Sequence, residues 1–194
     1  MLNLFNEINK ISFNEINKEM LEDVADIVCL DGAKVVCFSG NRPTSLPWKY
    51  NENCDMFIEF RKNMKLFLEM LVKRGINKFI SGMAMGFDII MAEIVLELKK
   101  DYPIELEGAI PCLGQEDKWS VDYKERYKSL FEKLDTVSLV SNTRYYDGCF
   151  HKRNHYMVDN ADFVVAGSFS EKGGTVSTIE YAKKKGKKVV VFGY

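Results

Sequence analysis

The last third of the chain holds residues whose types and spacing suit an anion site. Gly173 and Gly174 lie in a polar loop after the short apolar run 163–166, and the helical pattern that follows carries Glu180. Arg153 comes a little earlier in the chain. The first N–H groups of a helix are unpaired, and glycine lets a phosphate approach the backbone closely. An arginine and a carboxylate beside such a loop could form a nucleotide site.

Two earlier loops repeat this logic. The sequence Ser-Gly-Asn-Arg-Pro follows the apolar run 34–38, and Ser-Gly-Met-Ala-Met-Gly-Phe-Asp begins directly after the run 78–80. The second of these loops has neither the spacing of a Walker A loop nor that of a Gly-x-Gly-x-x-Gly loop. The candidate ligand-binding residues of all these segments are Ser39, Gly40, Arg42, Gly82, Met83, Gly86, Asp88, Asn154, Gly173, Gly174 and Thr175.

Two of the residues in or near these loops have two interpretations each. Asp88 falls in the first turn of an expected helix, where it would either cap the helix and complement its dipole or accept a hydrogen bond from a ribose hydroxyl. Trp48 lies in a long aromatic and proline-marked loop, where it would either stack on a base or cover the edge of the core.

The chemistry open to Glu180 and Arg153 is hydrolysis of an N-glycosidic bond. A carboxylate beside the anomeric carbon stabilises the developing positive charge and orients water, and an arginine holds the phosphate with its two-pronged guanidinium. The residue types alone indicate an Arg153–Glu180 ion pair that only joins two helices, and a catalytic role for the two residues needs further evidence.

A regular alternation of strands and helices must position these loops. Short apolar runs predict strands at 34–38, 78–80, 104–110, 137–140, 163–166 and 188–192. Helical spacing predicts helices between them, including one over 57–73 that Gly75 ends and one that starts at 115–119. The fold class is α/β, a Rossmann-like doubly wound and mainly parallel sheet with helices on both faces. Ligands bind such sheets beyond the carboxyl ends of the strands, where all these loops lie.

The length fits one domain at 34–194, preceded by an N-terminal helical appendage at 1–33. In the appendage, apolar residues recur at helical spacing and predict an amphipathic helix near 17–28. We interpret the appendage as a segment that packs on the domain or as a partner surface.

Composition argues against several classes of function. The net charge of −1 gives no electrostatic reason for binding nucleic acid or a membrane. The five cysteines show no paired spacing, and His151 and His155 have no evident third ligand, so we expect no metal site and no cofactor. No signal peptide and no membrane span is evident, and we expect a cytoplasmic protein.

The motifs together resemble a known family. In order they are SGNRP, SGMAMGFD, AIPC followed by Gln115 and Trp119, GCFHKRNHYMVDNAD and GGTVSTIEYA. This series resembles the YpsA-like branch of the SLOG superfamily, which also includes the LOG phosphoribohydrolases and DNA-processing protein A. The resemblance covers roughly residues 34–194. It implies a Rossmann-like fold with a nucleotide-type ligand at the carboxyl edge of the strands. A complete anion-binding edge combined with an altered catalytic loop leads us to expect a sensor or regulator that binds a nucleotide or an ADP-ribose-like molecule.

The resemblance to LOG enzymes places the candidate catalytic pair. Arg153 and Glu180 fall on the positions of the LOG catalytic residues, which implies a nucleoside 5′-monophosphate phosphoribohydrolase as the alternative function. Val176 stands where LOG enzymes have glycine, and Asn154 where they usually have lysine. A homodimer is also implied by the LOG-type relatives, and single-stranded DNA binding by DNA-processing protein A.

Overall fold

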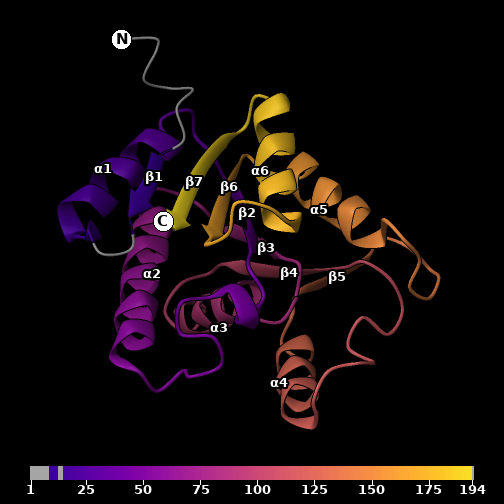
Figure 1. Ribbon diagram of the computed structural model, residues 1–194. Helices are drawn as coiled ribbons and strands as arrows, with labels where there is room; N and C mark the ends of the chain where they lie inside the picture. Colours follow the sequence, from indigo (N-terminus) through magenta and orange to yellow (C-terminus); the bar gives the residue numbers. More distant parts are fainter. Residues whose placement is uncertain (1–8, 13–14, 194) are drawn as a thin grey trace.

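The computed structural model describes residues 9–12 and 15–193 and shows a seven-stranded sheet between two layers of helices (Figure 1). The strands are β1 (Asn9–Ser12), β2 (Val35–Gly40), β3 (Lys78–Ser81), β4 (Glu105–Ile110), β5 (Thr136–Leu139), β6 (Phe163–Ser168) and β7 (Lys188–Gly193). The helices are α1 (Lys18–Cys29), α2 (Asp55–Lys73), α3 (Phe87–Leu98), α4 (Val121–Phe131), α5 (Cys149–Asp159) and α6 (Gly174–Lys184). The predicted fold class is confirmed.

All neighbouring strands run parallel, in the order β1-β7-β6-β2-β3-β4-β5. From β2 the chain moves outward through β3 and β4 to β5. It then returns along α5 to β6, on the other side of β2, and continues to β7. The direction of winding therefore switches between β2 and β6. Open α/β sheets bind ligands outside the carboxyl ends of the strands at this point.

The strands β2, β3, β4, β6 and β7 are largely buried, which explains their near-continuous apolar runs, whereas the edge strand β5 is mostly exposed. Within β2, Val36 and Phe38 pack in the core shared with α1, α2, α3 and α4, whereas Cys37 packs in the core shared with α5 and α6. The two helical layers are visible on opposite sides of the sheet in Figure 1.

The expected helices form where the periodicity placed them, with one difference in detail. The helix expected to start at 115–119 begins only at Val121, because residues 114–119 form turns closed by bonds from Asp117 N to Gly114 O and from Trp119 N to Glu116 O. Gly75, with φ of 102°, ends α2 as predicted.

The N-terminal segment contributes to both the sheet and a helical layer. The helix expected near 17–28 is α1, capped by the Asn17 side chain, which accepts a 2.9 Å hydrogen bond from Met20 N. The strand β1 was not predicted, and it pairs with β7 at the edge of the sheet. The parts of the appendage at 1–8 and 13–14 lie outside the described residues.

Phe87 packs directly on two strand backbones at the switch point. A Cβ built on Gly40 would lie 2.3 Å from atoms of this side chain, and one built on Gly167 would lie 2.2 Å from its ring. Both glycines are therefore needed to admit the Phe87 ring between α3 and the sheet.

We expect Gly167→Ala to lower the free energy of unfolding by about 1–3 kcal/mol, the usual cost of overpacking a core. Gly174→Ala is the matched control, because nothing lies closer than 4.0 Å to its added Cβ. Urea unfolding of both variants measures the difference. Equal stability of the two variants would contradict this account of the Phe87 contact.

Candidate functional site

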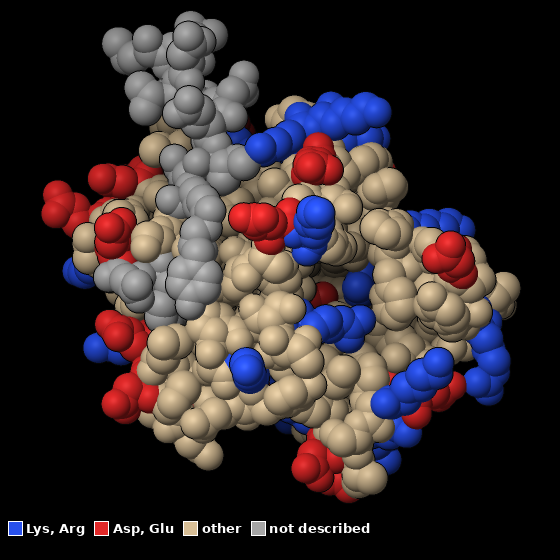
Figure 2. Space-filling model, in the orientation of Figure 1, with Lys and Arg blue, Asp and Glu red and all other residues tan. Residues whose placement is uncertain are grey.

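A polar cavity of about 290 Å³ lies beyond the carboxyl ends of the central strands. We call it the arginine cavity. Figure 2 shows a hollow in the middle of this face, with basic and acidic side chains in its depth. The lining residues come from the loop after β2, the start of α3, the first half of α5 and the start of α6: Ser39, Gly40, Asn41, Arg42, Thr44, Ser45, Ala84, Asp88, Phe150, Arg153, Asn154, Gly173, Gly174 and Thr175.

The structure thus brings together most of the predicted ligand-binding residues, although they lie far apart in the chain. Each predicted loop leaves the carboxyl end of a parallel strand, so the loops meet at one edge. The predicted residues that line the cavity are Ser39, Gly40, Arg42, Asp88, Arg153, Asn154, Gly173, Gly174 and Thr175.

Arg153 forms the buried floor of the cavity, with only 4% of its surface exposed. Its Nη1 donates to Gly82 O and, at 3.3 Å, to Ala109 O, and its Nε donates at 2.8 Å to Asn154 Oδ1. Burial lowers the pKa of Arg153, and the Asp88 carboxylate opposes this shift. The guanidinium is held in place by the protein before any ligand arrives.

Asp88 is the buried carboxylate of the arginine cavity, 3% exposed, in the first turn of α3. Burial raises its pKa, against the opposing charges of Arg153 and Arg42. Its Oδ1 accepts a 3.2 Å hydrogen bond from Gly40 N. No direct ion pair between Asp88 and either arginine is present among residues 9–12 and 15–193.

Arg42 is the cation that the protein leaves available. Its guanidinium lies 5.6 Å from the centre of the Phe150 ring and makes no hydrogen bond or ion pair to any other residue that the structure describes. Burial lowers its pKa, and Asp88 counteracts that effect. A half-buried guanidinium with unused donors is suited to a phosphate or carboxylate.

The start of α6 presents open backbone to the same cavity. Gly173 has φ of 124°, a conformation that favours glycine, and no atom lies within 4 Å of a Cβ built on it. Among the residues that the structure describes, no side chain caps the helix, so its first N–H groups can bind an acceptor. Asn154 Nδ2 donates at 2.8 Å to Thr178 Oγ1, which donates at 2.7 Å to Gly174 O. This chain of bonds links Arg153 to the first turn of α6.

Asn41 joins the two strands at the switch point, and sequence reasoning did not include it among the site residues. Its side chain accepts from Phe169 N at 2.5 Å and donates to Ser170 Oγ at 2.9 Å. Its position inside the Ser-Gly-Asn-Arg-Pro motif was the available signal. The other lining residues that were missed are Thr44, Ser45, Ala84 and Phe150.

Three predicted ligand contacts in the second glycine loop lie outside the cavity lining. A Cβ on Gly82 would meet the Arg153 guanidinium, and one on Gly86 would lie 2.5 Å from Asn41 O. Met83 is buried with φ of 53°, and its N–H donates to Ser81 Oγ. These residues shape the floor of the cavity.

Glu180 is exposed on α6 and does not line the arginine cavity. The alternative ion pair with Arg153 is not found within the described part of the chain. Val176, the departure from the LOG pattern, is half-buried in the first turn of α6 and also lies outside the lining.

Trp48 is buried, and its ring centre lies 4.6 Å from that of Phe60. Of its two interpretations, these contacts favour covering the edge of the core over stacking on a base.

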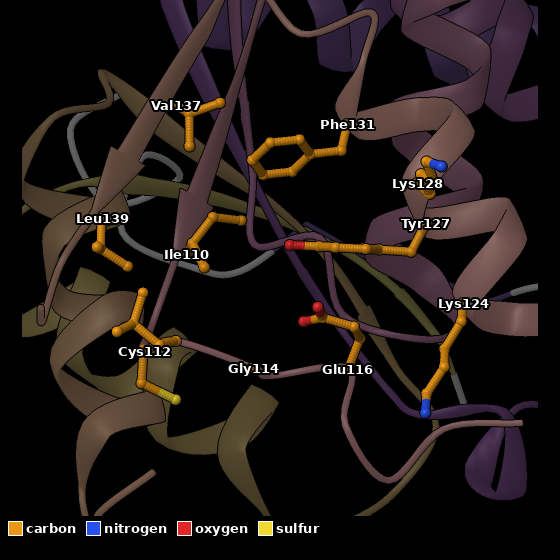
Figure 3. A pocket seen from close by; sticks show the side chains of 11 residues that line it. Ile110, Cys112, Gly114, Glu116, Lys124, Tyr127, Lys128, Phe131, Val137 and Leu139 are labelled. Carbon is orange, nitrogen blue, oxygen red and sulfur yellow. The ribbon is translucent and has the colours of Figure 1, made fainter. Parts of the chain in front are cut away.

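A larger cavity of about 520 Å³ lies between α4 and the sheet and is mostly apolar. Figure 3 shows Ile110, Val137 and Leu139 of the strands facing Tyr127 and Phe131 of α4. It shares no lining residue with the arginine cavity and lacks a buried charge, so we place the functional site at the arginine cavity despite its smaller volume.

The described residues show neither a metal-binding cluster nor a membrane-crossing helix. No group of three or more His, Cys, Asp or Glu side chains there is arranged to hold a metal ion. Within the same residues, no helix combines the length and apolar character needed to cross a membrane.

A doubly wound parallel sheet with a polar cavity at its switch point defines a Rossmann-like α/β protein. The chain belongs to the YpsA SLOG family, whose family model matches residues 36–189. This match confirms the resemblance stated above. UPF0398 proteins of Bacillus thuringiensis (strain Al Hakam) and Bacillus cereus (strain AH187) are each 30% identical over 129 residues, which is 65% of this chain and 70% of theirs.

Solved structures of DNA-processing protein A share the fold. The Helicobacter pylori protein, described for its single-stranded DNA binding mode, gives a TM-score of 0.57 at 20% identity, over 84% of this chain and 66% of that one. The Streptococcus pneumoniae protein gives 0.57 at 16% identity, over 85% of this chain and 52% of that one. This chain therefore spans about two thirds and about half of those proteins.

We expect Arg153→Met to lower the free energy of unfolding by roughly 3–5 kcal/mol at pH 7, because it removes the larger of the two positive charges that compensate the buried Asp88 carboxylate and the donor to two backbone carbonyls. The variant also raises the pKa of Asp88 further, because Arg153 lowers it. A group with a raised folded-state pKa contributes stability at low pH that is lost as the pH rises through that pKa. The loss of unfolding free energy caused by Arg153→Met should therefore be smaller at pH 4 than at pH 7.

Urea unfolding at both pH values checks this expectation. Arg61→Met is the control, because Arg61 pairs with Glu97 in a partly exposed ion pair, whose loss costs about 1 kcal/mol or less. A deficit of Arg153→Met that does not change with pH would contradict the electrostatic link between Arg153 and Asp88.

Proposed function

We propose that the protein binds a nucleotide or a nucleotide-derived ligand of the ADP-ribose type, with a phosphate of the ligand in the arginine cavity. The observation that carries this proposal is Arg42, whose guanidinium lines the cavity without a hydrogen bond or ion pair to another described residue. Across the same cavity, Gly173 and Gly174 present an uncapped helix start. A cation and free N–H groups that meet in one cavity favour an anion between them.

The charges of the cavity suit a phosphate joined to a sugar. Arg42 and Arg153 supply two positive charges, and Asp88 supplies one negative charge. The charge of Arg153 offsets the buried Asp88 carboxylate. The positive charge of Arg42 is then available to attract an anionic ligand. While it is ionised, Asp88 can only accept hydrogen bonds, and a ribose hydroxyl is a neutral donor that matches it.

The same geometry supports binding more than hydrolysis. A phosphoribohydrolase needs a carboxylate beside the anomeric carbon. Glu180 lies outside the cavity lining in this chain, and the Nε and Nη1 groups of Arg153 already donate hydrogen bonds within the protein. Free base released from AMP by the purified protein, and lost in Glu180→Ala, would establish the hydrolase instead.

Single-stranded DNA is the other candidate ligand, through the structural likeness to DNA-processing protein A. A net charge of −1 is a poor basis for binding a polyanion through its backbone. Retention of single-stranded DNA at low salt, weakened by the same substitutions at the cavity, would favour this candidate.

We expect Arg42→Ala to weaken binding of ADP-ribose or AMP by about 10- to 150-fold, because one charge-assisted hydrogen bond is worth roughly 1.5–3 kcal/mol. Gly174→Val should also weaken binding, because its side chain would occupy open space in the cavity. Thermal shift against a panel of nucleotides, NAD and ADP-ribose identifies the ligand, since a ligand at 100 times its Kd adds about 2.7 kcal/mol of stability.

Isothermal titration of that ligand then measures the loss in each variant. Arg61→Ala is the matched control, because Arg61 lies on a different surface and pairs with Glu97. Unchanged affinity in Arg42→Ala would exclude the arginine cavity as the phosphate site.

A further inference from the structure

A third cavity, of about 340 Å³, adjoins the arginine cavity and shares Arg42 and Phe150 with it. We call it the aromatic cavity. It lies between the loop that follows β4 and the loop that follows β5. Its remaining lining residues are Cys112, Leu113, Gly114, Gln115, Asp117, Lys118, Trp119, Arg144 and Tyr145.

We propose that the aromatic cavity holds the base of the nucleotide whose phosphate lies in the arginine cavity. This inference rests on the function proposed above and assigns a second part of the same ligand to a second set of residues. The phosphate would then lie on one side of the Arg42–Phe150 contact and the base on the other side.

The size of the two cavities favours a shared ligand. Cavities that bury a whole small molecule usually measure roughly 300–1,000 Å³. The arginine cavity, at about 290 Å³, is at the lower limit for such a ligand. A nucleotide with its phosphate there must extend beyond it, and the aromatic cavity is a neighbour that shares Arg42 and Phe150 with it.

The side chains of the aromatic cavity suit a planar ring. Tyr145 is 64% exposed, and its ring centre lies 5.9 Å from that of Phe150 with the planes tilted by 46°. Trp119 is half-buried and meets Tyr127 edge-on, at 5.4 Å and 84°. Trp119 and Tyr145 therefore offer aromatic surface from opposite loops, and every nucleobase has a face that stacks on such rings.

Polar contacts join the two loops that form the aromatic cavity. Arg144 Nη1 donates to Asp117 Oδ2 at 3.0 Å, and Leu113 N donates to Thr143 O at 2.8 Å. Gln115 donates from Nε2 to Met83 O at 3.2 Å, which anchors the first loop to the floor of the arginine cavity. The spacing between Trp119 and Tyr145 is thus set by the protein.

The apolar cavity under α4 is less suited to the base. Aliphatic side chains of β4 and β5 form one of its walls, as Figure 3 shows for Ile110, Val137 and Leu139. It also shares no residue with the arginine cavity, so the aromatic cavity lies between the two along the edge of the sheet.

The test is to titrate ribose 5-phosphate and AMP separately into the full chain and to compare the two affinities. We expect AMP to bind more tightly than ribose 5-phosphate. Tyr145→Ala or Trp119→Ala should weaken AMP about 5- to 150-fold, the range for loss of one base-stacking contact, and should leave ribose 5-phosphate unchanged. Tyr145→Phe should retain AMP binding, because the ring is kept.

Tyr50→Ala is the matched control, since Tyr50 is an exposed tyrosine, 57% accessible, that lines neither cavity. Equal affinity for ribose 5-phosphate and AMP, or variants that weaken both equally, would overturn the base site while the phosphate site stands. Failure of both ligands to bind would overturn the proposed function and this inference with it.

Discussion

The structure of the site depends on the burial of two opposite charges beneath the carboxyl edge of the sheet. Arg153 and Asp88 are both almost inaccessible to solvent, and each lowers the electrostatic cost of burying the other. Arg153 also satisfies the carbonyls of Gly82 and Ala109, so one side chain ties α5 to the ends of β3 and β4. The cavity above them can be polar because its floor is already neutralised.

A chain of hydrogen bonds connects the buried Arg153 side chain to the open side of the cavity. It runs from Arg153 to Asn154, from there to Thr178, and ends at Gly174 O in the first turn of α6. The free N–H groups of α6 are thus fixed relative to the buried guanidinium. Arg42, on the opposite loop, makes no side-chain hydrogen bond or ion pair to the residues that the structure describes.

The sequence was sufficient for the fold and for most of the cavity lining, because both follow from local patterns. Apolar runs separated by helical spacing imply a parallel sheet, and a parallel sheet brings Arg42, Asp88 and Gly174 to one edge. The short strand β1 was not predictable, since Asn9–Ser12 has no apolar pattern of its own and forms by pairing with β7.

Positions that depend on tertiary packing were harder to interpret. The glycines at 40, 82 and 86 suggested close approach of a ligand, but the structure fills the space beside them with Phe87, Arg153 and Asn41 O. A glycine that admits a protein side chain has the same sequence signal as one that admits a phosphate. Only the surroundings separate Gly173 and Gly174, beside which an added Cβ would meet no atom closer than 4.0 Å, from the others.

The central claim is that an anionic ligand lies between Arg42 and the first turn of α6. The most direct measurement is a titration of ¹⁵N-labelled protein with AMP and ADP-ribose, followed by the backbone amide signals of Gly174, Thr175 and Val176 and the Nε–Hε signal of Arg42. The account predicts that these signals move most and saturate together with one Kd. Saturable binding that leaves them unmoved and shifts signals on another face would contradict it.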